Sequence, residues 1–340
     1  MKGFGKHSTP KRSIVLSSND ILLSVRNLSV GFHSESDIVT IIDGVSFDIC
    51  KGEIFGLVGE SGCGKTVTAL ALLRLLPKPT TRILSGSISL AGMDILALPL
   101  QKLYDVRGRT ISMIFQEPSA ALNPLLSVRT QLDEYFEYHE YAGNPQQRID
   151  ELLNRVGFPD PDRILRAYPH ELSGGMLQRV MIAMALLLKP ALIIADEPTT
   201  ALDVTVQAQI MELLIEMQQE LGTSILFITH NLNLIAQYAD RLAVMYAGRI
   251  VEQSNLESFL FQPQHPYSRG LLAALPDLHA ENPTLTPIPG QVPQPSEYAA
   301  GCRFRERCPH TFDKCVHKPA LFETAPHRRV ACFLYDPEEK

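Results

Sequence analysis

The first part of the chain alternates short apolar stretches with polar positions. Over residues 21–49 the alternation has the period of two that half-buried strands show, and the polar stretch 33–37 interrupts it as a turn would. An almost wholly apolar run at 53–59 ends in glycine, and apolar residues then recur at helical spacing over 65–76. Because strand, glycine loop and helix in this order are typical of a parallel sheet, the pattern predicts an α/β fold.

The rest of the chain changes pattern three times. Short strands return over 86–115, and from about 120 to 190 the apolar spacing becomes helical. A second alternation of strands and helices follows up to about 252, and prolines accumulate after about 262. We therefore expect four parts, which are a flexible tail (1–20), a main domain (21–262), a helical segment within it (about 120–190) and an irregular, extended C-terminal extension (263–340).

Composition excludes several classes of protein. The 340 residues are 45% hydrophobic with a net charge of −6, which argues against nucleic acid as a partner. The longest apolar run, Val180–Leu188, falls far short of the roughly 20 residues that a membrane span needs. The basic start of the chain has no apolar segment behind it, so it is not a secretory signal. We expect a soluble, cytosolic protein whose thiols stay reduced.

A phosphate-binding loop lies between the predicted strand 53–59 and the helix after it. Residues 59–66 (GESGCGKT) fit the pattern G-x-x-x-x-G-K-[ST], whose glycines let backbone N–H groups surround phosphates at a helix N-terminus. Lys65 would reach the β- and γ-phosphates of ATP, and the Thr66 hydroxyl would bind Mg²⁺. A chance glycine turn is the alternative. The expected nucleotide contacts are Gly59, Glu60, Ser61, Gly62, Cys63 (backbone only), Gly64, Lys65, Thr66 and Val67.

Two carboxylates follow a second apolar strand. The run 191–197 (ALIIADE) ends in Asp196 and Glu197, at the tip where a parallel sheet places its ligand crevice. Asp196 would hold Mg²⁺ through water, and Glu197 would act as the general base on the attacking water. Taken alone this pattern is common, but together with the phosphate loop it indicates nucleotide hydrolysis.

The stretch 170–179 (HELSGGMLQR) distinguishes among the many families with such a loop. It resembles the LSGGQ signature of the ATP-binding subunits of ABC transporters, with Met176 in place of the final glutamine. The other motifs of that family occur in order. They are an adenine-stacking aromatic (Phe32), a Q-loop glutamine (Gln116, also toward Mg²⁺), a D-loop aspartate (Asp203) and an H-loop histidine (His230).

The resemblance implies a fold and a mechanism. The fold is the ABC type of P-loop NTPase, with a RecA-like α/β core, an antiparallel β subdomain, a helical signature subdomain and here a cysteine-containing extension. Two such domains hold ATP between them, so that Ser173, Gly174 and Gly175 cap the γ-phosphate of the partner's nucleotide. A helix N-terminus with these residues is itself an anion site. The alternatives are a core aromatic for Phe32 and a buried strand-end histidine for His230.

Further stretches resemble the peptide-importer branch, above all 265–276 (HPYSRGLLAALP). This branch implies a second ATPase subunit in a heterodimer, two membrane permeases and a solute-binding protein, with the ATPase on the cytoplasmic face of the cell membrane. Residues 122–126 would contact a membrane subunit. Cargo stays open among short peptides, nickel, antimicrobial peptides and other small solutes. A repair or translation ATPase fits less well, because only 131 residues separate Lys65 from Asp196 and only one phosphate loop is present.

Four of the six cysteines lie in the last 39 residues. Their wide spacing misses the C-x₂₋₄-C pairs of zinc sites, and it suits a [4Fe–4S] cluster, as does the resemblance to some importer ATPases. Zinc or no metal are the alternatives. We expect a structural role, with Arg303 and Arg307 offsetting the cluster's charge. The expected ligands are Cys302, Cys308, Cys315 and Cys332, with His310, His317 and His327 as possible substitutes.

Overall fold

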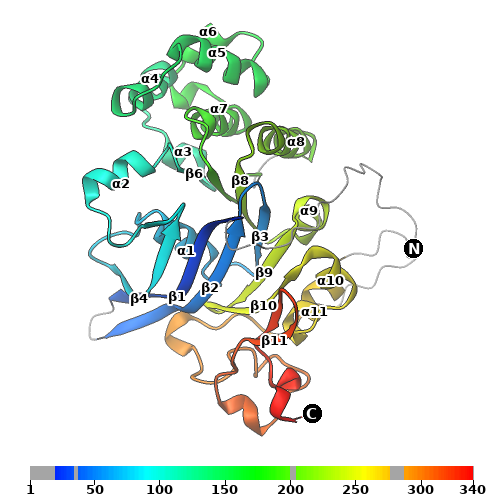
Figure 1. The fold of residues 1–340 in the computed structure, drawn as a ribbon. Helices are drawn as coiled ribbons and strands as arrows, with labels where there is room; N and C mark the ends of the chain where they lie inside the picture. Colours follow the sequence, from blue (N-terminus) through cyan, green and yellow to red (C-terminus); the bar gives the residue numbers. More distant parts are fainter. Residues whose placement is uncertain (1–19, 34–36, 200–203, 276–286, 340) are drawn as a thin grey trace, which may run out of the picture.

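An eight-stranded sheet runs through the molecule. The computed structural model describes residues 20–33, 37–199, 204–275 and 287–339, coloured in Figure 1. Five neighbouring strands of the sheet are parallel, and the remaining three continue it as an antiparallel edge. In spatial order the strands are β11 (Phe322–Ala325), β12 (Arg328–Val330), β10 (Arg249–Asn255), β9 (Arg241–Tyr246), β3 (Ile54–Val58), β8 (Ser224–Thr229), β7 (Leu192–Asp196) and β6 (Ile111–Ile114).

A smaller antiparallel sheet packs against this one. Its spatial order is β2 (Ile38–Cys50), β1 (Ile21–His33), β4 (Thr81–Leu90) and β5 (Met93–Asp94). The predicted strands over 21–49 are therefore confirmed, while most of the predicted turn between them lies outside the described residues. Together with the parallel strands, this sheet gives the mixed α/β architecture with an antiparallel β part that the resemblance implied.

Alternate residues of the central strands face two separate hydrophobic clusters. Along β3, Ile54 and Val58 belong to one cluster, and Phe55 and Leu57 belong to the other. This division follows from the strand period of two, because both faces of a central parallel strand are covered. One cluster lies between the two sheets. The other joins the sheet to the helical segment and includes Phe304 of the extension.

The helical segment and the C-terminal extension lie at opposite ends of the molecule (Figure 1). The segment predicted as helical over about 120–190 contains most of the helices from α3 (Pro118–Ala121) to α7 (Gly174–Leu186) and forms one end. In the described part the helices are α1 (Lys65–Leu72), α2 (Leu100–Val106), α3 (Pro118–Ala121), α4 (Val128–Tyr138), α5 (Pro145–Arg155), α6 (Pro161–Arg166), α7 (Gly174–Leu186), α8 (Val204–Leu221), α9 (Leu232–Tyr238), α10 (Leu256–Phe261) and α11 (Pro266–Ala273).

Two local predictions needed correction. The helix predicted over 65–76 ends at Leu72, because Arg74 adopts a left-handed conformation (φ +53°) and prolines follow. The extension is also more regular than its prolines suggested. It contains α11 and the hairpin of β11 and β12, which adds to the large sheet through β10.

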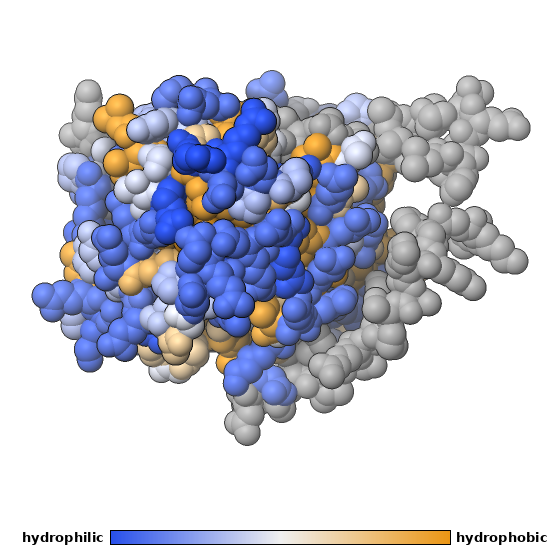
Figure 2. Space-filling view, turned by 90° about the horizontal axis from the view of Figure 1, so that it is seen from above, coloured by the Kyte–Doolittle hydropathy of each residue, from blue (hydrophilic) through white to orange (hydrophobic). Residues whose placement is uncertain are grey.

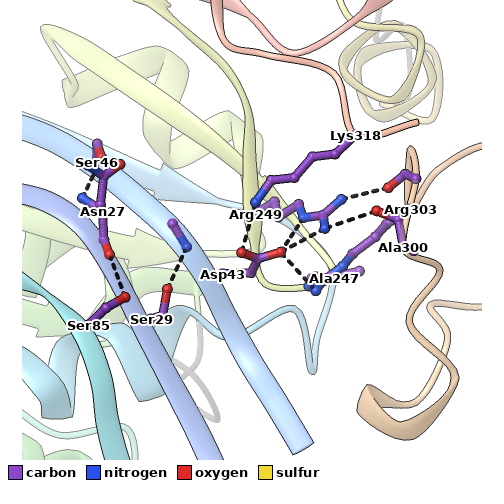
Figure 3. Close-up of polar contacts among 12 residues, drawn as sticks. Asn27, Ser29, Asp43, Ser46, Ser85, Ala247, Arg249, Ala300, Arg303 and Lys318 are labelled. Carbon is purple, nitrogen blue, oxygen red and sulfur yellow. Dashed lines mark hydrogen bonds and ion pairs between the residues drawn. The ribbon is translucent and has the colours of Figure 1, made fainter.

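A cluster of ion pairs fastens the extension to both sheets (Figure 3). Asp43 on β2 accepts from Arg249 on β10 at 2.7 Å, from Arg303 at 3.2 Å and from Lys318 at 2.8 Å. Burial alone would raise the pKa of Asp43, but the hydrogen bonds from Lys318 and Arg249 outweigh it and hold that pKa below its usual value. One carboxylate thus ties together three segments that are distant in sequence.

The face at the helical end is mostly hydrophilic, with small separate apolar spots (Figure 2). Patches of this size are ordinary for a surface exposed to water. Within the described ranges, no helix is long and apolar enough to cross a membrane.

Candidate nucleotide site

Four parallel strands deliver the predicted site residues to one edge of the sheet. The phosphate loop follows β3, Gln116 lies just beyond β6, Asp196 and Glu197 stand at the end of β7, and His230 follows β8. The carboxyl ends of parallel strands share one edge, so these residues converge. Apart from the buried Asp196, they border an open cleft of about 830 Å³. Its lining comprises Ile41, Gly59, Glu60, Ser61, Gly62, Gly64, Lys65, Thr66, Val67, Gln116, Glu197, His230, Leu232, Leu271, Gln294 and Pro295.

The phosphate loop leads into α1, which begins at Lys65. The N-cap of α1 is Gly64, whose φ of +106° suits glycine. A Cβ added there by any other residue would crowd the Ile42 side chain. Lys65 is buried, and its Nζ donates to the carbonyl oxygens of Gly59 (2.9 Å) and Glu60 (3.1 Å). The loop therefore places an ammonium group beside the free N–H groups at the start of a helix, which is an arrangement that binds anions.

Asp196 has the environment expected of a residue that holds a divalent ion. It is buried, interacts with the Thr66 hydroxyl, and its Oδ1 has no hydrogen-bond partner in the described part of the chain. Burial, together with the charge of Glu197, raises the pKa of Asp196 to about 6, although the Thr66 bond opposes the shift. A carboxylate and a hydroxyl are the oxygen ligands that Mg²⁺ prefers, so these residues fit the ion.

Glu197 is held by two of the other predicted residues. One carboxylate oxygen, Oε1, lies 2.9 Å from His230 Nδ1, and the other, Oε2, accepts from Gln116 Nε2 at 3.4 Å. Its backbone is left-handed (φ +46°) and its N–H donates to the Ile228 carbonyl oxygen at 2.9 Å. Strained backbone of this kind often occurs at functional sites. His230 is exposed, so the alternative of a buried histidine is wrong.

The signature lies at the start of α7 and outside this cleft. Ser173 is the N-cap of α7 and accepts a hydrogen bond from the Met176 N–H at 3.4 Å. Ser173 and Gly174 are exposed, and Gly175 is half-buried. None of the three lines the cleft of its own chain. These residues are therefore accessible to a second molecule.

Comparison with known families agrees with this geometry. Residues 42–200 match the family model described as ABC transporter, and residues 251–315 match the one described as oligopeptide/dipeptide transporter, C-terminal region. The oligopeptide transport ATP-binding protein AppD of Bacillus subtilis is 45% identical over 320 residues, covering 93% of this chain and 98% of that protein. This chain belongs to the ABC ATPases of the oligopeptide/dipeptide branch.

Other relatives and solved structures agree. The Escherichia coli protein OppD, an oligopeptide transport ATP-binding protein, is 46% identical over 316 residues (92% of this chain, 93% of that protein). A dimeric ATP-binding cassette bound to ADP and phosphate superposes with a TM-score of 0.62 and 26% identity, covering 69% of this chain and 98% of that one. CbiO1 of Clostridium perfringens superposes with a TM-score of 0.59 and 29% identity, covering 72% of this chain and 92% of that one. As a member of this family, the chain binds ATP with Mg²⁺ and hydrolyses it.

For two further predicted residues of this ABC ATPase the structure shows no contact with the cleft or gives no placement. Phe32 is half-buried, packs against the cluster between the sheets and is absent from the cleft lining. Its role in adenine stacking stays a prediction. Asp203 lies outside the described residues, so its placement stays a prediction too.

Sequence reasoning missed two extension residues that touch the phosphate loop. The Glu60 N–H donates to the Tyr267 hydroxyl oxygen at 2.9 Å, and the Arg307 guanidinium pairs with the Glu60 carboxylate at 2.7 Å. The stretch containing Tyr267 stood out as branch-specific, but nothing in it indicated this contact. Arg307 and Arg303 were expected to offset charge at the cysteines. They instead pair with Glu60 and Asp43.

The four cysteines of the extension lie in electrostatic reach of one another. Burial, with contributions from other cysteines of this set, raises the pKa of Cys302 and Cys308, and that of Cys332 reaches about 11. The Cys302 N–H donates to the Cys315 carbonyl oxygen at 3.0 Å. All four are free thiols. No group of three or more His, Cys, Asp or Glu side chains among the residues described is placed to hold a metal ion.

Proposed function

We propose that this chain is the ATP-hydrolysing subunit that energises the import of short peptides across the cell membrane. It would act on the cytoplasmic face with a second ATPase subunit, two membrane permeases and a solute-binding protein. The extension's match to the oligopeptide/dipeptide family and the names of the transport proteins that it resembles support the peptide cargo. Nickel, antimicrobial peptides or another small solute are the alternative cargoes.

The arrangement around Glu197 is the observation that carries the hydrolytic role. Its carboxylate is oriented by His230 on one oxygen and Gln116 on the other, in the cleft that the phosphate loop also lines. We assign Glu197 as the general base that takes a proton from the attacking water. With one hydrogen-bonding partner on each oxygen, the carboxylate of Glu197 is held in a fixed orientation at the cleft.

The remaining cleft residues would hold the nucleotide. Mg²⁺, when bound with ATP, neutralises charge on the β- and γ-phosphates. Thr66 and Gln116 would provide oxygen ligands, and Asp196 would hold the ion through water. Lys65 would exchange its two backbone carbonyls for phosphate oxygens, and residues 59–67 would supply N–H groups to the same phosphates. Phe32 would stack on adenine.

The signature would act on the nucleotide of the partner ATPase. Ser173, Gly174 and Gly175 start a 13-residue helix, and their N–H groups with the Ser173 hydroxyl suit a γ-phosphate. Asp203 would complete this contact between the subunits. Residues 122–126, of which Leu125 is strongly exposed, would meet a membrane subunit.

Substituting Glu197→Gln tests the hydrolytic role. We expect ATP turnover to fall by about 10²–10⁴-fold, because the amide cannot accept the proton. Binding of ATP should persist, since Glu197 contributes little to it, whereas Lys65→Ala should weaken binding. Turnover unchanged in Glu197→Gln would show that another group is the base.

An uptake assay tests the cargo. The chain is co-expressed with candidate membrane subunits and a binding protein in cells that lack peptide import, and uptake of labelled dipeptides and tripeptides is compared with that of Ni²⁺. Peptide uptake that requires Lys65 supports the proposal. Uptake of Ni²⁺ alone would assign the nickel alternative.

We also propose that residues 263–340 form a unit stapled by a [4Fe–4S] cluster on Cys302, Cys308, Cys315 and Cys332. All four are free thiols, and after burial the other three help to raise the pKa of Cys332, which supports this assignment. Four separate irons take one thiolate each, so the sulfurs need not meet at a single ion. Iron and sulfide analysis of an anaerobic preparation tests it. Colourless protein with stoichiometric zinc, or protein without metal, would contradict it.

A further inference from the structure

One residue of the phosphate loop is held from outside the ATPase core. Glu60 is the second residue of the loop, and both of its carboxylate oxygens accept from Arg307, Nη1 to Oε2 at 2.7 Å and Nη2 to Oε1 at 3.1 Å. Two parallel charge-assisted bonds of this kind fix orientation as well as distance. Arg307 belongs to the extension, 247 residues further along the chain.

A second group of the extension holds the backbone of the same residue. The Tyr267 hydroxyl oxygen accepts from the Glu60 N–H at 2.9 Å. Tyr267 is fully buried, and burial raises its pKa, so the phenol stays neutral. Its position is set by His265, the N-cap of α11, whose Nδ1 accepts from the Tyr267 N–H at 3.0 Å.

Arg307 has little freedom to move. Its side chain is only 8% exposed, and its Nε donates to the Pro289 carbonyl oxygen at 2.8 Å. The guanidinium lies over the rings of Tyr246 (5.7 Å) and Phe304 (6.0 Å). Tyr246 contacts Tyr267 and Phe304 edge to face, and the rings of Tyr267 and Phe304 are tilted against each other; all three belong to the cluster that joins the sheet to the helical segment. Glu60 is therefore attached to a rigid support.

The held residue is itself in contact with the phosphate-binding lysine. The Glu60 carbonyl oxygen accepts from Lys65 Nζ at 3.1 Å. Leu271, Gln294 and Pro295 of the extension also line the nucleotide cleft. The extension thus contributes both a wall of the cleft and the anchor of its loop.

We propose that Arg307 and Tyr267 are positioning residues for ATP binding, and that through Glu60 the C-terminal extension sets the affinity of the phosphate loop for nucleotide. The inference rests on the proposed function, because it assigns these residues to the same ATP site. Neither residue needs to touch ATP. They fix the conformation in which the loop binds phosphates. Without them, part of the binding free energy of ATP would be spent on ordering the loop, so the affinity would fall.

The test measures binding of trinitrophenyl-ATP and the KM for ATP on the full-length chain with Arg307→Ala, Tyr267→Phe and Arg305→Ala. Tyr267→Phe keeps the ring packing and removes only the acceptor. Arg305→Ala is the matched control, because that neighbouring side chain is 37% exposed and, among the described residues, pairs only with Glu306 at 4.0 Å. We expect the affinity for nucleotide to fall about tenfold in Arg307→Ala and severalfold in Tyr267→Phe, with little change in the control. The larger loss follows because Arg307 makes hydrogen bonds to a charged group, whereas Tyr267 makes one to a neutral group.

Four outcomes separate the possibilities. Folded Arg307→Ala and Tyr267→Phe proteins that bind with wild-type affinity would overturn the inference, even if their thermal stability falls. An equal loss in Arg305→Ala would overturn it as well. Glu60→Gln combined with Arg307→Ala should be no worse than Arg307→Ala alone, since the two residues act as one pair. Lys65→Ala separates this from the proposed function, because wild-type binding in that variant would contradict the ATP site itself.

Discussion

Replacing Asp43 by asparagine should loosen the extension from both sheets. The substitution keeps the shape of the side chain and removes the one negative charge that Arg249, Arg303 and Lys318 share (Figure 3). The charged form of Arg303 is already disfavoured, because burial and then the charge of Arg249 lower its pKa to about 10. Without Asp43 the two arginines would repel each other with no carboxylate between them.

The size of the effect follows from burial. Arg303 and Arg249 are only 7% and 13% exposed, so removing their partner leaves buried charges, which costs about 3–5 kcal/mol. Lys318 is half exposed, and its pair contributes less than about 1 kcal/mol. The amide oxygen of the new asparagine still accepts hydrogen bonds, so we expect a loss of stability at the lower end of this range. About 3 kcal/mol corresponds to a fall in Tm of roughly 6 °C for a large domain.

Thermal unfolding followed by circular dichroism measures this, with limited proteolysis of the extension as a second readout. Asp48→Asn is the control on the same strand, because Asp48 pairs with the 48% exposed Arg26 and should cost less than about 1 kcal/mol. Equal falls in Tm for the two variants would refute the argument from burial. The pKa of Asp43 is lowered on folding, so its contribution is present above pH of about 4 and is lost as the pH falls through the lowered value. Wild type and variant should therefore converge in acid.

Three further variants or conditions test other parts of the structure. Because Asp196 must be ionised to hold Mg²⁺ and its pKa is about 6, the apparent Mg²⁺ affinity with ATP should fall about tenfold per pH unit below that value. A flat Mg²⁺ titration across this range would contradict the raised pKa. Gly248→Ala should lower the free energy of unfolding by more than about 1 kcal/mol, because φ is +80° and the added Cβ would overlap the Ile41 carbonyl oxygen. Denaturant titration measures it. Ser173→Ala should cost about 1 kcal/mol through the lost cap of the Met176 N–H, seen in the same titration, and an unchanged midpoint would argue against that cap.

The cleft could be predicted from sequence because each of its elements is marked locally. The phosphate loop sits between a strand and a helix, and Glu197 and His230 each follow an apolar strand. Parallel pairing then brings strand ends together whatever lies between them. Short local motifs, together with the rule that parallel strands end at one edge, were therefore enough to predict where these residues meet.

Contacts between distant segments could not be predicted in this way. Tyr267 and Arg307 meet Glu60 across 207 and 247 residues, and no spacing in the sequence encodes that approach. The helix α2 was not predicted either, and its seven residues are too few for a clear period. The early end of α1 depends on the left-handed Arg74, a residue type that gives no such signal.

The hairpin of β11 and β12 has a consequence for the solubility of shortened chains. It pairs with β10 through Glu252 and Gln253, at what would otherwise be the outer strand of the large sheet. A bare outer strand presents unpaired N–H and C=O groups that recruit other chains. A chain cut before residue 322 would keep every nucleotide motif, but β10 would become an exposed edge strand able to pair with other chains. The strand pairing from residue 322 onward thus protects the large sheet against self-association.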